Sequence, residues 1–255
     1  MIAMVDIRLL TAYICAILLL VSCQFAPPAN YAYTPEIVSE RCVLAERLLA
    51  LLPPEQRDAP AAVQEATWLA DTSYRAGVAI ARYNEPFFMA WMNNRMVNSI
   101  FTWRERGLCW HYQHDMYREL RRRRLEYFRI GCCVRDRNKG SEHHCVYLAP
   151  VTVRWPQCII IDPWLWNGRL EVLYNGSFST DKWQEEEGVL PYLQSIYPEE
   201  HNKPFEHWAR VKAGWYYRDY AESSSPRGRA SRQGRLMQRR IEQGMRLRGG
   251  KLYSY

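Results

Sequence analysis

Three short segments of this chain carry side chains that together could attack an amide. Attack on an amide carbonyl by sulfur needs a thiolate, a base, a group that orients the base, and donors for the oxyanion. The chain offers the first three in the order cysteine, histidine, aspartate. The segments are 106–111, which contains Cys109; 142–148, which contains His143 and His144; and 159–164, which contains Asp162.

The position of Cys109 in its segment favours an activated thiol. Gly107 stands just before it, and a helix-like run follows it, so the thiol is expected at a helix N-terminus. There the helix dipole and the free backbone N–H groups favour the thiolate, whose unperturbed pKa is about 8.5. His143 and His144 open a strand, where neighbouring side chains face opposite sides, so only one of them can point at Cys109.

The segment Gly107-Leu108-Cys109-Trp110 resembles the Gly-x-Cys-Trp around the nucleophile of papain-like peptidases and transglutaminases. Together with Glu142-His143 and Asp162-Pro163-Trp164, it more closely resembles a group of bacterial lipoproteins with a transglutaminase-like cysteine core, over roughly residues 87–175. The resemblance implies that Cys109 is the nucleophile, His143 the base and Asp162 the orienting group. His143 is favoured because it directly follows an acid, as in that pattern, and His144 is the alternative base.

One feature departs from the papain-like pattern. Papain-like peptidases carry a glutamine a few residues before the cysteine as an oxyanion donor, and residues 103–108 contain none. The candidate donors are Asn94, Asn98, the Trp103 indole and the backbone N–H of Cys109.

The elements that must position these residues follow from periodicity and from helix-start and turn signals. Four helical patterns come first, and shorter strand patterns follow them, with Asn167-Gly168 as a hairpin turn. This order predicts an α+β fold, in which N-terminal helices and an antiparallel sheet pack on a central helix that bears the nucleophile. Residues 176–220 show no clear period. The predicted helices are 34–52, 61–82, 86–105 and 109–124, and the predicted strands are 125–134, 145–148, 158–161, 164–166 and 170–174.

The N-terminus predicts export. Leu9 to Val21 is an uncharged stretch of 13 residues, too short for a membrane span and typical of a signal peptide. It ends in Leu20-Val21-Ser22-Cys23, which resembles the bacterial lipobox and implies lipidation of Cys23. The expected organisation is a signal peptide over 1–22, a tether over 23–33, one domain over 34–222, and a tail over 223–255. The expected location is the bacterial envelope, lipid-anchored at the outer membrane and facing the periplasm; an ordinary cleaved signal or a short anchor helix is the alternative.

The basic charge belongs to the tail. Residues 226–255 hold nine Arg or Lys against one acid, a net of +8, and the whole chain is +7, so the other 225 residues sum to −1. An exported protein with a near-neutral domain is not expected to bind nucleic acid. The tail is expected to be disordered or to form a loose helix around 236–245, and it suits docking on an anionic surface.

Six cysteines lie beyond the lipobox: Cys42, Cys109, Cys132, Cys133, Cys145 and Cys158. The envelope permits disulfides, and a bridge from Cys132 or Cys133 to Cys145 or Cys158 is expected between neighbouring strands. His111 and His114 beside Cys109 suggest metal ligands only weakly, because the chain has no CxxC or HExxH spacing. No metal and no cofactor is therefore predicted.

The sequence thus predicts a lipoprotein with a Cys-His-Asp site for acyl transfer or hydrolysis at amide bonds. The expected substrate is a protein or a peptidoglycan peptide. The alternative is a non-catalytic envelope lipoprotein that uses the same fold as a binding module.

Overall fold

The computed structural model describes residues 26–84, 86, 90, 107–137, 139, 141–174, 182–205, 207–208 and 211. Cys23, the basic tail, and the helix expected over 86–105, apart from residues 86 and 90, lie outside this described part. Among the helices that are described, none is long and apolar enough to cross a membrane.

Helices dominate the first half of the described chain, and three of them begin at a proline. Proline suits the first helical position because its ring presets φ and its missing N–H would have no helical partner there. The predicted helices at 34–52, 61–82 and 109–124 are confirmed within a few residues. The helices are η1 (Tyr31–Tyr33), α2 (Pro35–Leu51), α3 (Pro54–Arg57), α4 (Pro60–Asn84), α6 (Cys109–Leu120), α7 (Val189–Ile196) and η2 (Pro198–Glu200).

The strands form one five-stranded antiparallel sheet in the order β4-β3-β2-β1-β5. The first four strands follow one another as a meander, and β5 returns to pair with β1 at the opposite edge. The predicted α+β class is confirmed, including the turn at Asn167-Gly168 that joins β3 to β4. The strands are β1 (Phe128–Arg135), β2 (His143–Pro150), β3 (Ile159–Trp166), β4 (Arg169–Leu173) and β5 (Trp183–Glu186).

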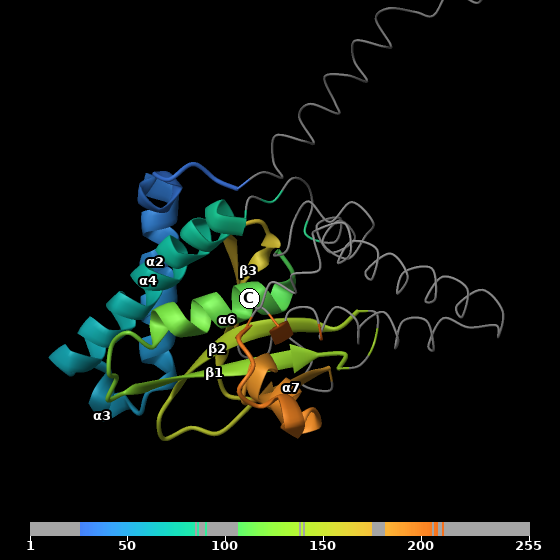
Figure 1. Ribbon diagram of the computed structural model, residues 1–255. Coiled ribbons are helices and arrows are strands. Elements are labelled where there is room, and N and C mark those ends of the chain that lie inside the picture. Colours follow the sequence, from blue (N-terminus) through green and yellow to red (C-terminus); the bar gives the residue numbers. More distant parts are fainter. Residues whose placement is uncertain are drawn as a thin grey trace, which may run out of the picture.

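The helices and the sheet form packed layers (Figure 1). Helix α6 lies against β1, β2 and β3, while α4 contacts α6, β3 and β4, and α2 packs on α4. Every residue of β2 is buried, so both sides of this central strand are covered. Val146 and Leu148 join the core beneath the helices, whereas Cys145 and Tyr147 join a second cluster with Trp183. This alternation is what a strand buried on both faces requires.

Two contacts fix α4 to the sheet. The buried Glu65 carboxylate accepts the backbone N–H groups of Glu126 at 2.7 Å and Tyr127 at 3.0 Å, just before β1 begins. At the other end, Gly77 and Gly168 bring α4 and the β3–β4 turn into backbone contact, and a Cβ on Gly168 would lie 2.5 Å from Cβ of Ala81. Helix α4 therefore holds both the start of β1 and the hairpin after β3.

The structure corrects two expectations. Residues 176–220 contain β5 and α7, which the sequence pattern did not indicate. The expected disulfide is wrong, since all six described cysteines are free thiols. Cys133 does lie opposite Cys145 in the β1–β2 pairing. However, the Cys133 Sγ turns to the Cys145 carbonyl oxygen at 3.6 Å, and the Cys145 Sγ turns to Nε2 of His143 at 3.3 Å.

The contact at Gly168 predicts a stability difference between two glycines. Gly168 and Gly188 have similar positive φ values of 99° and 105°, but only Gly168 is crowded. Gly168→Ala should lower the free energy of unfolding by about 2–4 kcal/mol, because backbone strain and overpacking add. Gly188→Ala should cost only the strain, about 1–2 kcal/mol. Urea denaturation of both variants measures the difference, and equal losses would contradict the close approach of α4 to the hairpin.

Candidate active site

Cys109 is the first residue of α6, as the sequence predicts. The chain enters the helix through Gly107, whose φ of 123° suits glycine, and an extended Leu108. The Leu108 N–H donates to Nδ1 of His111 at 3.1 Å, and the Trp164 indole N–H donates to the Gly107 carbonyl at 2.9 Å. These bonds hold the start of α6 both to its own first turn and to β3.

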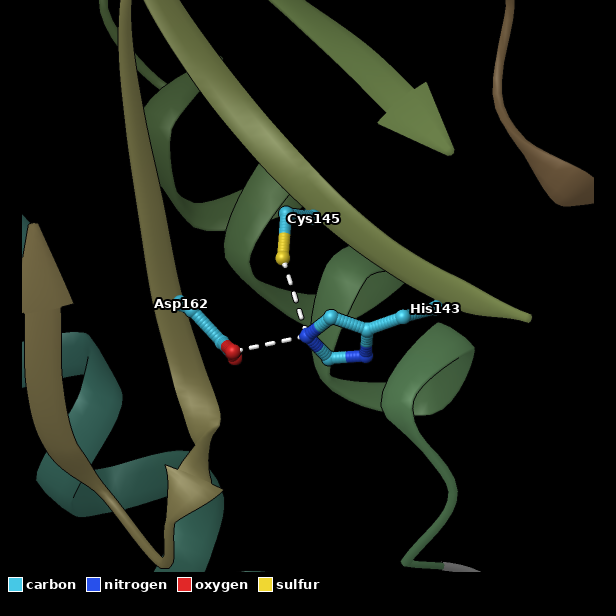
Figure 2. Close-up of side chains that lie close together, drawn as sticks. All are labelled: His143, Cys145 and Asp162. Atoms are coloured by element: carbon cyan, nitrogen blue, oxygen red, sulfur yellow. Dashed lines mark hydrogen bonds and ion pairs between the residues drawn. The ribbon is translucent and has the colours of Figure 1, made fainter. Parts of the chain in front are cut away.

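His143 and Asp162 come together through the pairing of β2 with β3. Val146 pairs with Ile161, and the two strands continue past that pair toward His143 and Asp162. Nε2 of His143 lies 2.7 Å from Oδ2 of Asp162, and both side chains are buried (Figure 2). The other carboxylate oxygen, Oδ1, accepts the backbone N–H of Trp164 at 2.8 Å. The Asp162 carboxylate therefore has partners on both oxygens, which fixes it and, through it, the imidazole.

The thiol of Cys109 lies beside this imidazole. Its Sγ is 3.9 Å from the Glu142 carbonyl oxygen, at the residue before His143. Asp162 takes Nε2 of the ring, and the other ring nitrogen, Nδ1, is buried and has no hydrogen-bond partner among the described residues. Hydrogen bonds at catalytic sites are often long before substrate binds. The imidazole therefore has the Asp162 carboxylate at one nitrogen, and the Cys109 thiol lies next to the start of the strand that carries the imidazole.

The charges of the three groups support one another. Burial alone would raise the pKa of the Cys109 thiol, but its interaction with His143, and more weakly with His144, holds the pKa below the usual value. Burial would lower the pKa of His143, but the charge and the hydrogen bond of the Asp162 carboxylate hold it well above the usual value. Burial would raise the pKa of Asp162, but the His143 charge and hydrogen bond lower it. The site therefore favours thiolate, imidazolium and carboxylate.

Cys145 is a second thiol at the same imidazole. It lies two residues after His143, hence on the same side of β2, and its Sγ is 3.3 Å from Nε2 (Figure 2). Burial raises the pKa of this thiol to about 12, and the nearby Asp162 charge adds to the increase. At neutral pH Cys145 is therefore a neutral thiol, and its pKa is shifted in the opposite direction from that of Cys109.

His144 belongs to a different network. Its Nδ1 lies 2.8 Å from Oε1 of Glu186, and its Nε2 lies 2.6 Å from Oε1 of Glu142. Carboxylates accept hydrogen bonds, so both ring nitrogens donate and the ring carries a positive charge. Glu186 also accepts from the Gln113 amide at 2.9 Å and from Arg137 at 2.6 Å. His144 thus links β2 to β5 through Glu186. Because Gln113 donates to the same carboxylate, the link extends to α6, the helix that carries Cys109.

The structure brings Asp162 to His143 and places His144 against Glu142 and Glu186. Sequence reasoning missed Cys145, although its spacing of two from His143 on a strand was a usable signal. It also missed Gln113 and Glu186. Nothing in the sequence around Glu186 indicated a strand, so its approach to His144 had no local signal.

Donors for an oxyanion are present at the start of α6. The first N–H groups of a helix have no partner within the helix. Leu108 O accepts from His111 N–H and Tyr112 N–H, which leaves the N–H groups of Cys109 and Trp110 open within the described residues. The other candidates, Asn94, Asn98 and Trp103, lie outside the described residues.

Comparison of this chain with protein-family models, with curated proteins and with solved structures finds no match in any of the three.

The ion pair between His143 and Asp162 predicts a pH-dependent coupling. A raised pKa of His143 gives stability that is full below about pH 6.5 and is lost as the pH rises through the folded-state value. A lowered pKa of Asp162 gives stability that is full above about pH 3.9 and is lost as the pH falls through the folded-state value. The contribution of the pair is therefore largest between about pH 4 and pH 6.5.

A double-mutant cycle with His143→Gln and Asp162→Asn measures this coupling by urea denaturation. Asp162→Asn should cost about 3–5 kcal/mol near pH 5.5, because it leaves a buried imidazolium without its partner. The coupling energy should decline toward pH 3 and toward pH 9. A coupling that is independent of pH would show that the pair is a neutral hydrogen bond.

Proposed function

We propose that this protein is a thiol-dependent acyltransferase or hydrolase acting at amide bonds, with Cys109 as nucleophile, His143 as base and Asp162 as the group that orients the base. The 2.7 Å bond from His143 to Asp162, made beside a thiol at a helix start, carries the proposal. The lowered pKa of Cys109 agrees with it. The helix-on-sheet arrangement supports a transglutaminase-like or papain-like core.

The proposed reaction has two steps. The Cys109 thiolate attacks the amide carbonyl carbon, and as the S–C bond forms and the C–N bond breaks, the His143 imidazolium gives its proton to the leaving amine. Water or a second amine then attacks the thioester and gives its proton to His143, and the Cys109 sulfur leaves as thiolate. Asp162 stays ionised throughout and stabilises the imidazolium.

The backbone N–H groups of Cys109 and Trp110 are the proposed donors to the tetrahedral oxygen. They lie at the N-terminus of α6, where the helix dipole also favours negative charge. A backbone donor at the nucleophile itself compensates for the missing glutamine.

The proposed substrate is a protein or a peptidoglycan peptide, and the proposed setting is the bacterial envelope. Both rest on the N-terminal sequence, in which Leu20-Val21-Ser22-Cys23 follows an uncharged stretch. The basic tail over 223–255 would help the lipid at Cys23 to hold the protein at an anionic surface.

One observation favours a second candidate. Cys109 and His143 are each only 5% exposed, and side chains buried to this extent suit a site that a substrate does not enter. In that case the protein is a non-catalytic envelope lipoprotein that uses the same fold as a binding module. The reactivity of Cys109 separates the two candidates.

Iodoacetamide labelling of Cys109, followed by mass spectrometry across a pH series, tests the proposal. The native protein should label Cys109 rapidly near neutral pH. His143→Gln should move labelling to the range of an ordinary thiol, with a pKa of about 8.5, because the positive ring beside the sulfur is lost.

His144→Gln is the matched control, since it changes the neighbouring residue on the other side of the strand. It should retain most of the neutral-pH labelling, because His144 lowers the pKa of Cys109 less than His143 does. Circular dichroism checks that both variants are folded. Labelling of native Cys109 only at alkaline pH, with no change in either variant, would rule out the enzyme and favour the binding module.

A further inference from the structure

A cysteine sulfur and a carboxylate oxygen both lie close to one imidazole nitrogen. Nε2 of His143 is 2.7 Å from Oδ2 of Asp162 and 3.3 Å from Sγ of Cys145 (Figure 2). The three atoms all lie within 4.8 Å of one another, and the three residues are buried. The proposed thiol reaction uses His143 and Asp162 but has no role for Cys145.

These three atom types match the ligands that Zn²⁺ takes in proteins. At usual bond lengths, a tetrahedral Zn²⁺ sets its nitrogen about 3.5 Å from its sulfur and about 3.4 Å from its carboxylate oxygen. The sulfur, at 3.3 Å, is close to that separation, and the carboxylate oxygen, at 2.7 Å, needs to withdraw by about 0.7 Å. Three protein ligands leave a fourth position for water or another small ligand, as at zinc sites that stay open.

The surroundings suit a metal site as well. The Asp162 Oδ1 is held by the backbone N–H of Trp164 at 2.8 Å and of Leu165 at 3.3 Å, so Oδ2 faces the ligand position. Such outer hydrogen bonds orient metal ligands and strengthen binding. The two strands that carry the ligands are locked by the Val146–Ile161 pairing next to them.

We propose that His143, Cys145 and Asp162 form a Zn²⁺ site that switches off the thiol at Cys109. On binding, the ion takes the places of the Nε2 hydrogen of the imidazolium and the Cys145 thiol hydrogen, so two protons leave to solvent. A thiol that coordinates Zn²⁺ is deprotonated by the ion, so the high pKa of Cys145 in the metal-free protein is no barrier. This site differs from the weak cluster of Cys109, His111 and His114 that the sequence suggests.

The consequence for Cys109 follows from the chemistry of the ring. An imidazole that coordinates Zn²⁺ through Nε2 keeps a hydrogen on Nδ1, the nitrogen that Asp162 does not occupy, and can no longer accept the Cys109 thiol proton. Metal binding and the imidazolium–carboxylate pair therefore exclude each other. This inhibitory effect rests on the proposed function, whereas the metal site itself does not.

Titration of the full-length, reduced protein with Co²⁺ and Zn²⁺ tests the site. Co²⁺ should give a thiolate-to-metal charge-transfer band with tetrahedral d–d bands, saturating at one ion per chain, and Zn²⁺ should displace it. Cys145→Ser should weaken Zn²⁺ binding by at least about a hundredfold. Cys158→Ser is the matched control, because Cys158 is also a buried thiol whose pKa burial raises to about 12. It should bind as the native protein does.

Cys109→Ala separates the metal site from the thiol reaction. This variant should keep the Co²⁺ spectrum, because Cys109 is not a ligand. Cys145→Ser should still label at Cys109 near neutral pH, and Zn²⁺ should no longer inhibit that labelling. Absence of stoichiometric binding, equal losses in the two serine variants, or loss of the Co²⁺ band in Cys109→Ala would each overturn the proposed site. Neutral-pH labelling that fails in metal-free protein, with the metal data unchanged, would instead overturn the proposed function alone.

Discussion

The requirement that buried charges be paired governs the start of strand β2. His143 and His144 are both buried, and each ring is bonded to carboxylate oxygen: His143 to Asp162, and His144 to Glu142 and Glu186. An unpaired charge in such a place would cost several kcal/mol, so strand register and partner position must agree. The rest of the fold supplies the partners. Strand β3 brings Asp162, β5 brings Glu186, and α6 brings Gln113 as a further donor to Glu186.

The alternation of side chains along β2 divides these pairs between two tasks. His143 and Cys145 share one side with Asp162, where the imidazole can exchange a proton with Cys109 or bind a metal ion. His144 points the other way and ties β2 to β5 and α6. The positive charge of His144 also lowers the pKa of Cys109, although less than His143 does. Two adjacent histidines can therefore serve different roles, one in the reaction and one in holding the fold, because successive side chains of a strand point to opposite faces of the sheet.

Much of this fold could be predicted from local sequence, because helix starts, helical periodicity and the Asn167-Gly168 turn are short-range signals. The position of Cys109 at a helix start followed from Gly107 and the pattern after it. Strand β5 could not be predicted, since Trp183–Glu186 has no hydrophobic alternation and depends on its pairing with β1. The expected disulfide failed because strand pairing places two side chains on the same face but does not set their rotamers: the sulfurs of Cys133 and Cys145 turn to different partners. One of the two partners of His144, Glu186, is a long-range contact, and no local pattern marks it.

The sheet order has a consequence for how the chain assembles. Strands β1 to β4 can pair in the order of synthesis, each with its immediate predecessor, which is a fast and local process. Strand β5 must instead return across the sheet, so that Glu186 finds its place opposite Cys132. Cys109, His143 and Asp162 are all present in the nascent chain before β5 emerges. Until β5 docks, His144 lacks one of its two carboxylates, and the outer edge of β1 is open to any other strand. Among the described strands, β5 is therefore the last to be added; it covers the open edge of β1 and completes the carboxylate support behind the thiol.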